Sequence, residues 1–329
     1  MIKSLKTRRN LIHLCCTLCL FIFLKELYSL QELDISNDYY IDEDIFTHIR
    51  DVKFSPKANS IYFHVTSLQG YMKPSAACAV EAAARAHPRK EVYVLFTSPI
   101  TDSDIVTRRY MSITLKKIQR FRNIKLLRVH LPEYSNGTVV ESLLLNNLKN
   151  SIFPEQHTAD IVKILTLNKY GGVAIDTNMI VLKTLSSLPP NWILKENEIY
   201  VAPGIMGFAK NGIGLNVTSA ILKEIADTYK PNNLDITNRI VIEKVVQRIC
   251  PIRIRWDGCK DIFIYPSDEF YPIDNVFGMS FPKAPLSQSA FSFHLDTLTS
   301  AVHMVSQDIL NTFCPSIYLE FQDNLLVLD

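Results

Sequence analysis

The segment YGGVAIDTNMIVL, residues 170 to 182, places one carboxylate and one amide inside an otherwise apolar run. Asp176 closes the strand-like stretch VAID, and Asn178 follows two residues later. In an extended chain this spacing turns both side chains to the same side, with Thr177 opposite. Two such oxygen ligands can bind one hard divalent cation, Mn²⁺ or Mg²⁺, which neutralises charge on a diphosphate. The alternative is that Asp176 and Asn178 simply begin a turn between two strands.

Three further residues are candidates for the same chemistry. Asp160 and Lys163 are three residues apart in a predicted helix, so they share a face and either bind polar groups of a nucleotide or pair with each other. His303, in SAVHMV, is either a metal or phosphate ligand or a hydrogen-bonded core residue. The chain has no GxxxxGK, GxSxG, CxxC or HExxH motif, so P-loop, serine-hydrolase, zinc-finger and zincin chemistry have no sequence signal.

The elements that must position these residues alternate between strand and helix. Residues 60–67 and 91–98 have the apolar character of buried strands, and residues 75–88 between them predict a helix. A third strand at 123–131 follows a predicted helix at 112–121. This order predicts an α/β fold built on a nucleotide-binding type of sheet.

The predicted helix over residues 157–170 leads directly into the acidic segment. Thr158 is its predicted N-cap, and Gly171 lies where a helix end favours a left-handed residue. A short strand at 173–176 follows. Because ligands of open α/β sheets collect at the carboxyl ends of strands, Asp176 lies where a binding site usually forms. Further strands are expected at 179–185, 290–295 and 300–306, and further helices at 216–230 and 237–249.

The N-terminus has a basic flank followed by an apolar segment. We expect a cytoplasmic tail at residues 1–10, a retained signal-anchor transmembrane segment at 11–30 and an acidic stem at 31–55. Residues 56–329 then form a single lumenal domain, because no linker-like change of composition occurs within them. The alternative is a cleaved signal peptide, but no A-x-A-like site follows the apolar run.

Composition and charge limit the classes of partner. The chain has 329 residues, of which 47% are hydrophobic, so it can bury a substantial core. Its formal net charge is +2, which provides no global field to attract a polyanion. We therefore expect no nucleic-acid partner.

Four cysteines lie outside the predicted anchor, and four can pair completely. The short separation of Cys250 and Cys259 favours that pair and leaves Cys78 with Cys314. Disulfides agree with a lumenal body, whereas four buried free thiols are the alternative. The sequon at Asn136 and a second at residue 216 agree with the same compartment.

Several ordered segments resemble the family of α-1,4-galactosyltransferases and α-1,4-N-acetylglucosaminyltransferases, which share a DXD sugar-binding region. The likeness extends over roughly residues 58 to 318 and is far more specific than a DXD motif alone. The matching segments are ADIVKILTLNKYGGVAIDTNMIVLKTL at 159–185, CAVEAAARAHP at 78–88, FYPI at 270–273, AVHMVS at 301–306 and FCP at 313–315.

The resemblance implies a type II Golgi membrane protein with a GT-A-like nucleotide-sugar-binding fold. Such an enzyme takes a hexose or N-acetylhexosamine from a UDP-sugar with Mn²⁺ and transfers it, with retention and in α-1,4 linkage, to a terminal sugar of a glycolipid or glycan. By motif position Asp176 and Asn178 occupy the metal and diphosphate site, and His303 corresponds to the family's late histidine. Asp160 and Lys163 occupy the nucleotide-side D-x-x-R positions. The resemblance assigns no catalytic residue.

The departures from the family pattern cluster at the site. Lys163 replaces an arginine, Ala174 a tyrosine, Asn178 the second aspartate and Val305 a tryptophan, and APG at 202–204 replaces N-G-A. Framework motifs are kept while ligand motifs change. Two hypotheses follow: an active hexosyltransferase, or a catalytically inactive relative that binds a glycan, a nucleotide or a partner protein.

Overall fold

The structure is a computed structural model, and it describes residues 45–100, 109–195, 201–234, 239–250, 259, 261–271, 273–276, 279–282, 290–295 and 310–321. The predicted anchor at 11–30, His303 and Val305 lie outside these residues. Within the described ranges, no helix combines the length and the apolar character needed to cross a bilayer.

Strands and helices alternate in the first half of the chain. The elements are β1 (Ile61–Val65), α3 (Pro74–Ala86), β2 (Val92–Phe96), α5 (Arg109–Ile118), β3 (Ile124–Arg128), α6 (Leu131–Ser135), the π-helical η1 (Leu143–Asn147), the 3₁₀-helical η2 (Leu148–Asn150), α7 (Pro154–Tyr170), β4 (Gly172–Ile175) and β5 (Met179–Val181).

The second half contains β6 (Trp192–Lys195), β7 (Val201–Phe208), α8 (Gly212–Thr228), α9 (Arg239–Ile249), β8 (Phe263–Tyr265), the 3₁₀-helical η4 (Ser267–Glu269), β9 (Ile273–Val276), β10 (Met279–Pro282), β11 (Ser292–His294) and α11 (Pro315–Phe321). β9 pairs with β10, and β11 with β5, in two small antiparallel sheets.

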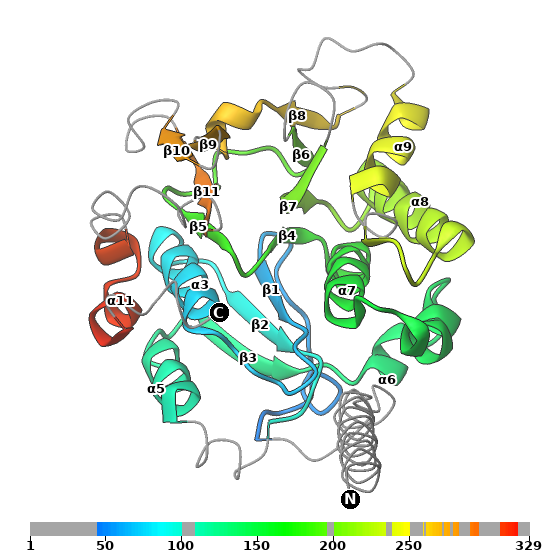
Figure 1. Ribbon diagram of the computed structural model, residues 1–329. Coiled ribbons are helices and arrows are strands. Elements are labelled where there is room, and N and C mark those ends of the chain that lie inside the picture. The colour runs from blue at the N-terminus through cyan, green and yellow to red at the C-terminus, as the bar shows by residue number, and fades with distance from the viewer. Residues whose placement is uncertain are drawn as a thin grey trace, which may run out of the picture.

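The central sheet has seven strands in the order β3-β2-β1-β4-β7-β6-β8 (Figure 1). β1 pairs in parallel with β2 on one side and with β4 on the other, and β2 pairs in parallel with β3. β7 runs antiparallel to β4 and β6, and β8 is parallel to β6. The predicted α/β class is therefore confirmed, as a mixed sheet rich in parallel strands.

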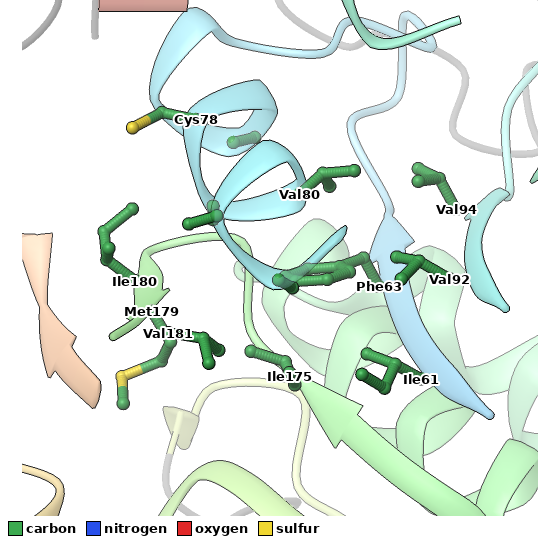
Figure 2. Close-up of a cluster of buried hydrophobic side chains, with 14 of the residues drawn as sticks. Ile61, Phe63, Cys78, Val80, Val92, Val94, Ile175, Met179, Ile180 and Val181 are labelled. Atoms are coloured by element: carbon green, nitrogen blue, oxygen red, sulfur yellow. The ribbon is translucent and has the colours of Figure 1, made fainter. Parts of the chain in front are cut away.

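Alternate strand residues face two separate helical layers. Ile61 and Phe63 of β1 belong to the core shared with α3, α5 and α11, whereas Tyr62 belongs to the core shared with α7, α8 and α9. Figure 1 shows these two groups of helices on opposite sides of the sheet. Figure 2 shows part of the first core, which includes Phe63 of β1, Val92 of β2 and Val80 of α3. Each fully buried Ile or Phe contributes about 1.5–3 kcal/mol relative to an exposed one.

Helix α7 begins earlier than predicted. Thr158 is not the N-cap, because the helix starts at Pro154 after Phe153, and the Thr158 hydroxyl donates to Pro154 O at 2.7 Å. Proline is favoured at the first helical position, where no N–H partner is needed. At the other end Gly171 and Gly172 have φ values of 66° and 107°, which side chains would strain. This glycine pair turns α7 directly into β4.

Strands β6 and β7 were not expected from the sequence. β7 contains Pro203 and two glycines, which normally argue against a central strand. The structure shows why glycine is needed at Gly207, since a Cβ there would collide with the indole of Trp192 on β6. β5 is also shorter than predicted and ends at Val181.

Residues 45–54, in the range assigned to the stem, contact edge strand β3. Ile49 N donates to Arg128 O, and Arg128 N donates to Thr47 O, both at 3.0 Å. Phe46 is buried in the core. These residues therefore belong to the folded body, and they cover part of a sheet edge that would otherwise be open to another chain.

Both disulfides favoured by the sequence are present. Cys78 on α3 is bonded to Cys314, which immediately precedes α11, and Cys250 is bonded to Cys259. The first bond closes a separation of 236 residues and the second a separation of 9. The long-range bond ties the C-terminal helix to the first helix of the fold.

A buried carboxylate holds α11 beside this disulfide. Glu81 of α3 is fully buried, and its two carboxylate oxygens accept hydrogen bonds from Ser316 N and Ile317 N, both at 3.0 Å. Arg85 Nε donates to the same carboxylate at 2.7 Å. The first backbone N–H groups of a helix have no partner within it, so a carboxylate is favourable there.

Glu81→Gln should destabilise the protein by about 1–3 kcal/mol, because an amide cannot accept all three hydrogen bonds and leaves a buried N–H unpaired. Urea unfolding measures this loss. Glu320→Gln on α11 is the matched control, since Glu320 forms a partly exposed ion pair with Lys117 and should change stability by less than about 1 kcal/mol. Equal effects of the two substitutions would contradict the assignment.

A buried histidine at the end of α3 makes stability depend on pH. His87 Nδ1 lies 2.9 Å from Ala83 O, and His87 Nε2 accepts from Leu185 N at 2.8 Å. Since Nε2 accepts, the single proton resides on Nδ1. Burial, opposed by the hydrogen bond to Ala83 and aided by the charge of Lys90, lowers the pKa of His87 to about 4.

The unfolded chain should titrate this histidine near its ordinary pKa of about 6.5, so stability falls as pH drops from about 6.5 towards 4. Between about pH 8 and about pH 5, His87 alone should account for roughly 2 kcal/mol of lost stability. Urea unfolding of the wild type and of His87→Gln at both pH values measures this difference. An identical pH dependence in the two proteins would show that His87 is not responsible.

Candidate functional site

A hollow lies at the carboxyl ends of β1 and β4. The chain passes from β1 to β2 and β3 on one side of β1 and returns to β4 on its other side, so the crevice between β1 and β4 is a topological switch point. The hollow has a volume of about 550 Å³, within the usual size of a small-molecule site. Its lining includes Thr66, Lys73, Glu155, Asp160, Asp176 and Asn178.

A tight turn carries the two candidate metal ligands into this hollow. Met179 N donates to Asp176 O at 3.0 Å, and Asp176 N donates to Gly204 O of β7 at 2.7 Å. Leu295 N donates to Asn178 O at 2.7 Å. The strand alternation predicted for this segment is wrong, because Thr177 lines the hollow together with Asp176 and Asn178. Backbone hydrogen bonds to Gly204 and to Leu295 therefore hold the turn on both sides.

Lys163 joins three elements beneath this turn. Its side chain is only 3% exposed, and its Nζ lies 2.5 Å from Asp176 Oδ1 and 3.7 Å from Asp160 Oδ1. The ammonium also donates to Pro203 O at 3.1 Å. Asp176 follows β4, Asp160 lies in α7 and Pro203 lies in β7, so one buried cation connects the helix to two strands of the sheet.

The two carboxylates determine the charge state of Lys163. Burial alone would lower the pKa of Lys163, but the carboxylates of Asp176 and then Asp160 outweigh burial and hold the pKa above its ordinary value. Lys163 is therefore cationic at neutral pH. Two carboxylates against one ammonium leave the cluster with a net negative charge, which favours a further cation over a bare anion.

The structure brings together four of the five residues singled out by the sequence. Asp160, Asp176 and Asn178 line the hollow, and Lys163 pairs with both aspartates. The pairing of Asp160 with Lys163 is thus present, as one part of a larger ion cluster. The fifth residue, His303, lies outside the described residues.

Three residues that contribute to the site were not predicted from the sequence. The Pro203 carbonyl belongs to a strand that was not predicted. Glu155 follows Pro154 at the start of α7, and its Oε1 accepts from Leu68 N at 2.8 Å, which holds the loop after β1. His64 of β1 also lines the hollow. Its signal was visible, because it is a polar residue within the apolar strand YFHV.

The site suits a hard divalent cation with few protein ligands. The Asp176 side chain is 32% exposed, so its carboxylate is open to a ligand although one oxygen pairs with Lys163. Asn178 can add a neutral carbonyl oxygen. No group of three His, Cys, Asp or Glu residues able to hold a metal occurs among the described residues. One carboxylate and one amide fit an ion of the Mg²⁺ type, which keeps waters and binds substrate phosphates.

A second hollow of about 250 Å³ lies between residues 48–54 and the ends of α6 and α7. Its lining is basic and aromatic, with Arg50, Arg128 and Lys169 against the single carboxylate of Glu133. Arg50 and Glu133 form an ion pair with each other. This hollow offers no pair of oxygen ligands at a strand end, so the chemistry sought from the sequence belongs to the first hollow.

Two family models match successive parts of the chain. Residues 74–199 match the glycosyltransferase sugar-binding region containing the DXD motif, and residues 211–319 match the alpha 1,4-glycosyltransferase conserved region. The first match contains the whole Asp160, Lys163, Asp176 and Asn178 cluster. The second covers α8, α9 and the segments that follow them.

Several known proteins are similar to this chain at low identity. The human lactosylceramide 4-alpha-galactosyltransferase is 25% identical over 224 residues, which is 66% of this chain and 61% of the relative. The rat protein of the same name is 24% identical over 201 residues, covering 60% and 53% respectively. An uncharacterised protein of Arabidopsis thaliana is 24% identical over 192 residues, covering 56% and 28%. The chain thus spans about three fifths of the length of the human relative.

Solved structures show a weak overall likeness. The glycosyltransferase PaToxG aligns with 60% of this chain and 71% of its own, at a TM-score of 0.45 and 14% identity. The galactosyltransferase LgtC, solved with donor and acceptor sugar analogues, aligns with 54% of this chain and 68% of its own, at a TM-score of 0.32 and 13% identity.

Lys163→Met should destabilise the protein by about 3 kcal/mol, because it leaves the carboxylates of Asp160 and Asp176 without their shared counter-charge. Lys163→Arg keeps the charge and should lose much less. Urea unfolding at neutral pH measures both variants. Lys223→Met is the control, since Lys223 pairs with Asp227 on an exposed helix face and should show no measurable change. A Lys163→Met protein as stable as the wild type would contradict this role.

Proposed function

Because the chain belongs to the family of alpha 1,4-glycosyltransferases with a DXD sugar-binding region, we propose that it transfers a sugar from a nucleotide donor to an acceptor. The donor is a UDP-hexose or UDP-N-acetylhexosamine, and the acceptor is a terminal sugar of a glycolipid or glycan. The transfer forms an α-1,4 linkage with retention and requires a divalent cation. The sheet order and the place of the hollow support a GT-A-like fold for this chemistry.

The observation that carries the proposal is the placement of the DXD-like turn. Asp176 and Asn178 lie at the switch point of the sheet, in a hollow large enough for a nucleotide-sugar, and the DXD family model covers them. A binding site at this position follows from the topology alone. The residue types then select the ligand, since a carboxylate with an oxygen-bearing neighbour suits a cation bound to phosphate.

Each residue of the cluster has a distinct task. Lys163 holds the Asp176 carboxylate in place through their ion pair and compensates its charge. Asp160 balances Lys163 from α7. Asp176 and Asn178 would hold the cation, with His303 as a further ligand by family resemblance. When bound, the cation supplies positive charge that stabilises the departing diphosphate.

A second candidate function has an observation in its favour. Asn178 brings no charge to the cation, and Ala174, at a family tyrosine position, is fully buried in the core beside α7. The first departure lowers the charge available to a cation, and the second replaces a tyrosine with an apolar side chain in the core. The second candidate is a non-catalytic module that keeps the fold and binds a glycan, a nucleotide or a partner protein.

We also propose a location in the Golgi membrane as a single-pass type II protein with a lumenal catalytic domain. The basic flank and apolar run at residues 1–24 support an anchor with this orientation. The disulfides Cys78–Cys314 and Cys250–Cys259 support a body on the oxidising side of the membrane.

Calorimetric titration of the full chain with UDP, with and without Mn²⁺, tests the proposal. UDP should bind at least about tenfold more tightly with Mn²⁺, because the net negative cluster needs a cation to accept a diphosphate. Asp176→Ala should abolish the metal-dependent part. A folded wild-type protein that binds no UDP under either condition would exclude the nucleotide-sugar site.

Asn178→Asp separates the two candidate functions. A second carboxylate should raise Mn²⁺ affinity roughly tenfold, since affinity for hard cations rises with ligand charge. UDP release from a UDP-sugar panel with a galactose-terminated acceptor then measures transfer. If the wild type releases UDP and the variant releases it faster, the result supports an active transferase. UDP binding without release by either protein supports the non-catalytic module.

A further inference from the structure

His64 is the residue in the hollow whose chemistry the proposed function does not use. It is the fourth residue of β1, is 8% exposed, and lines the hollow at the switch point. Its two strand neighbours, Phe63 and Val65, face the opposite core. The imidazole is therefore directed to the α7 side of the sheet, the side on which Lys163 lies.

A chain of hydrogen bonds determines where the imidazole proton resides. Thr166 Oγ1 lies 2.7 Å from Val162 O, and a carbonyl can only accept, so the Thr166 proton is committed to that bond. Thr166 Oγ1 must then accept from its other two partners, His64 Nε2 and Tyr134 Oη, each at 2.8 Å. Burial raises the pKa of Tyr134 well above its ordinary value, so its phenol remains a donor. His64 Nε2 consequently carries a proton.

The second ring nitrogen is left as an acceptor. Burial, and then the nearby charge of Lys163, lower the pKa of His64 to about 3, so the ring is neutral at physiological pH and Nδ1 carries no proton. In the described part of the chain, Nδ1 has no hydrogen-bond partner, and it is not among the atoms closed off from solvent. Because His64 lines the hollow, this lone pair is accessible from the hollow.

The fold has no use for this acceptor. The hydrogen bond from Nε2 to Thr166 satisfies one ring nitrogen, whereas Nδ1 faces the hollow with no donor among the residues that the structure describes. A leucine would fill the same space without it. An acceptor in such a position is satisfied by water until a ligand supplies an N–H or O–H group.

The surrounding residues indicate which part of a nucleotide-sugar lies there. If the 176–178 turn binds the diphosphate, the rest of the hollow extends towards the end of β1 and the first turns of α3 and α7. Most of the residues that line the hollow belong to that part, where we place the nucleoside. This assignment rests on the proposed function.

We propose that His64 Nδ1 accepts a hydrogen bond from an N–H or O–H group of the donor nucleoside and so determines nucleotide specificity. Two groups have this chemistry, the imide N–H of uracil and a ribose hydroxyl. Cytosine would present a lone pair instead of the imide N–H, so two acceptors would face each other. A site built around one hydrogen bond rejects ligands that leave its polar group unpaired.

The test is calorimetric titration of the full chain, in the presence of Mn²⁺, with UDP, CDP, 2′-deoxy-UDP and 3′-deoxy-UDP. The proteins are the wild type, His64→Leu and Thr166→Val, each first shown to be folded by circular dichroism. His64→Leu should weaken UDP binding about tenfold. If the partner is the imide, the preference for UDP over CDP should fall to near unity in this variant. If the partner is a ribose hydroxyl, one deoxy analogue should bind both proteins equally.

Thr166→Val removes the acceptor for Nε2 and keeps the imidazole. Nitrogen NMR of the ring should show Nδ1 unprotonated in the wild type and shifted by UDP, with a mixed tautomer population in Thr166→Val. A merely structural role for His64 would not move this signal when UDP is added.

The outcomes separate the two proposals. If the wild type binds no UDP, both the proposed nucleotide-sugar site and the proposed role of His64 are wrong. A wild type that binds UDP, with His64→Leu unchanged for every ligand, overturns only the role of His64. Loss of Mn²⁺ binding by His64→Leu without nucleotide would also overturn it, because the lone pair would then be a metal ligand.

Discussion

The buried ammonium of Lys163 is the interaction on which the geometry of the site depends. It lies where α7, the end of β4 and β7 meet, and each of these elements supplies it with one oxygen. A charge this deeply buried is tolerated only with close partners, so the three elements are held at a fixed separation. The turn that carries Asp176 and Asn178 into the hollow is therefore held by the ion pair with Lys163 and by backbone hydrogen bonds to Gly204 and Leu295.

The same charge organises the rest of the hollow. The ammonium pairs with Asp176, whose carboxylate stays partly exposed, and its charge helps to keep His64 neutral on the neighbouring strand. One face of the hollow thus presents anionic oxygens and another presents an uncharged acceptor. A ligand that satisfies both must combine cation-bound phosphate with hydrogen-bond donors, and a nucleotide is such a ligand.

Much of this arrangement follows from local sequence patterns. The strands at β1 to β4, helix α3 and the left-handed Gly171 at the end of α7 were predicted because their signals lie within a few residues. The disulfide Cys78–Cys314 followed from elimination among four cysteines. Strand β7 was not predicted, because Pro203 and Gly204 argue locally against a strand, and only the packing of Trp192 and Tyr271 explains the glycines. The start of α7 was placed too late because Thr158 resembles a cap, although it donates within the helix.

The candidate site residues were likewise predictable from the sequence, whereas the contacts between them were not. Asp160, Lys163, Asp176 and Asn178 were found from spacing and family resemblance, yet nothing in the sequence showed that one ammonium binds both aspartates across two elements. His64 was part of a predicted strand, but its role depends on the proton positions of Thr166 and Tyr134, which are distant in sequence.

The most direct test of the account is a crystal structure of the protein grown with UDP and Mn²⁺, with anomalous diffraction used to locate the manganese. The account predicts a manganese peak bonded to Asp176 and Asn178, bridging phosphate oxygens, with the uridine extending towards His64. Nucleotide density elsewhere, such as in the basic hollow beside Lys169, or a manganese position remote from Asp176, would contradict it.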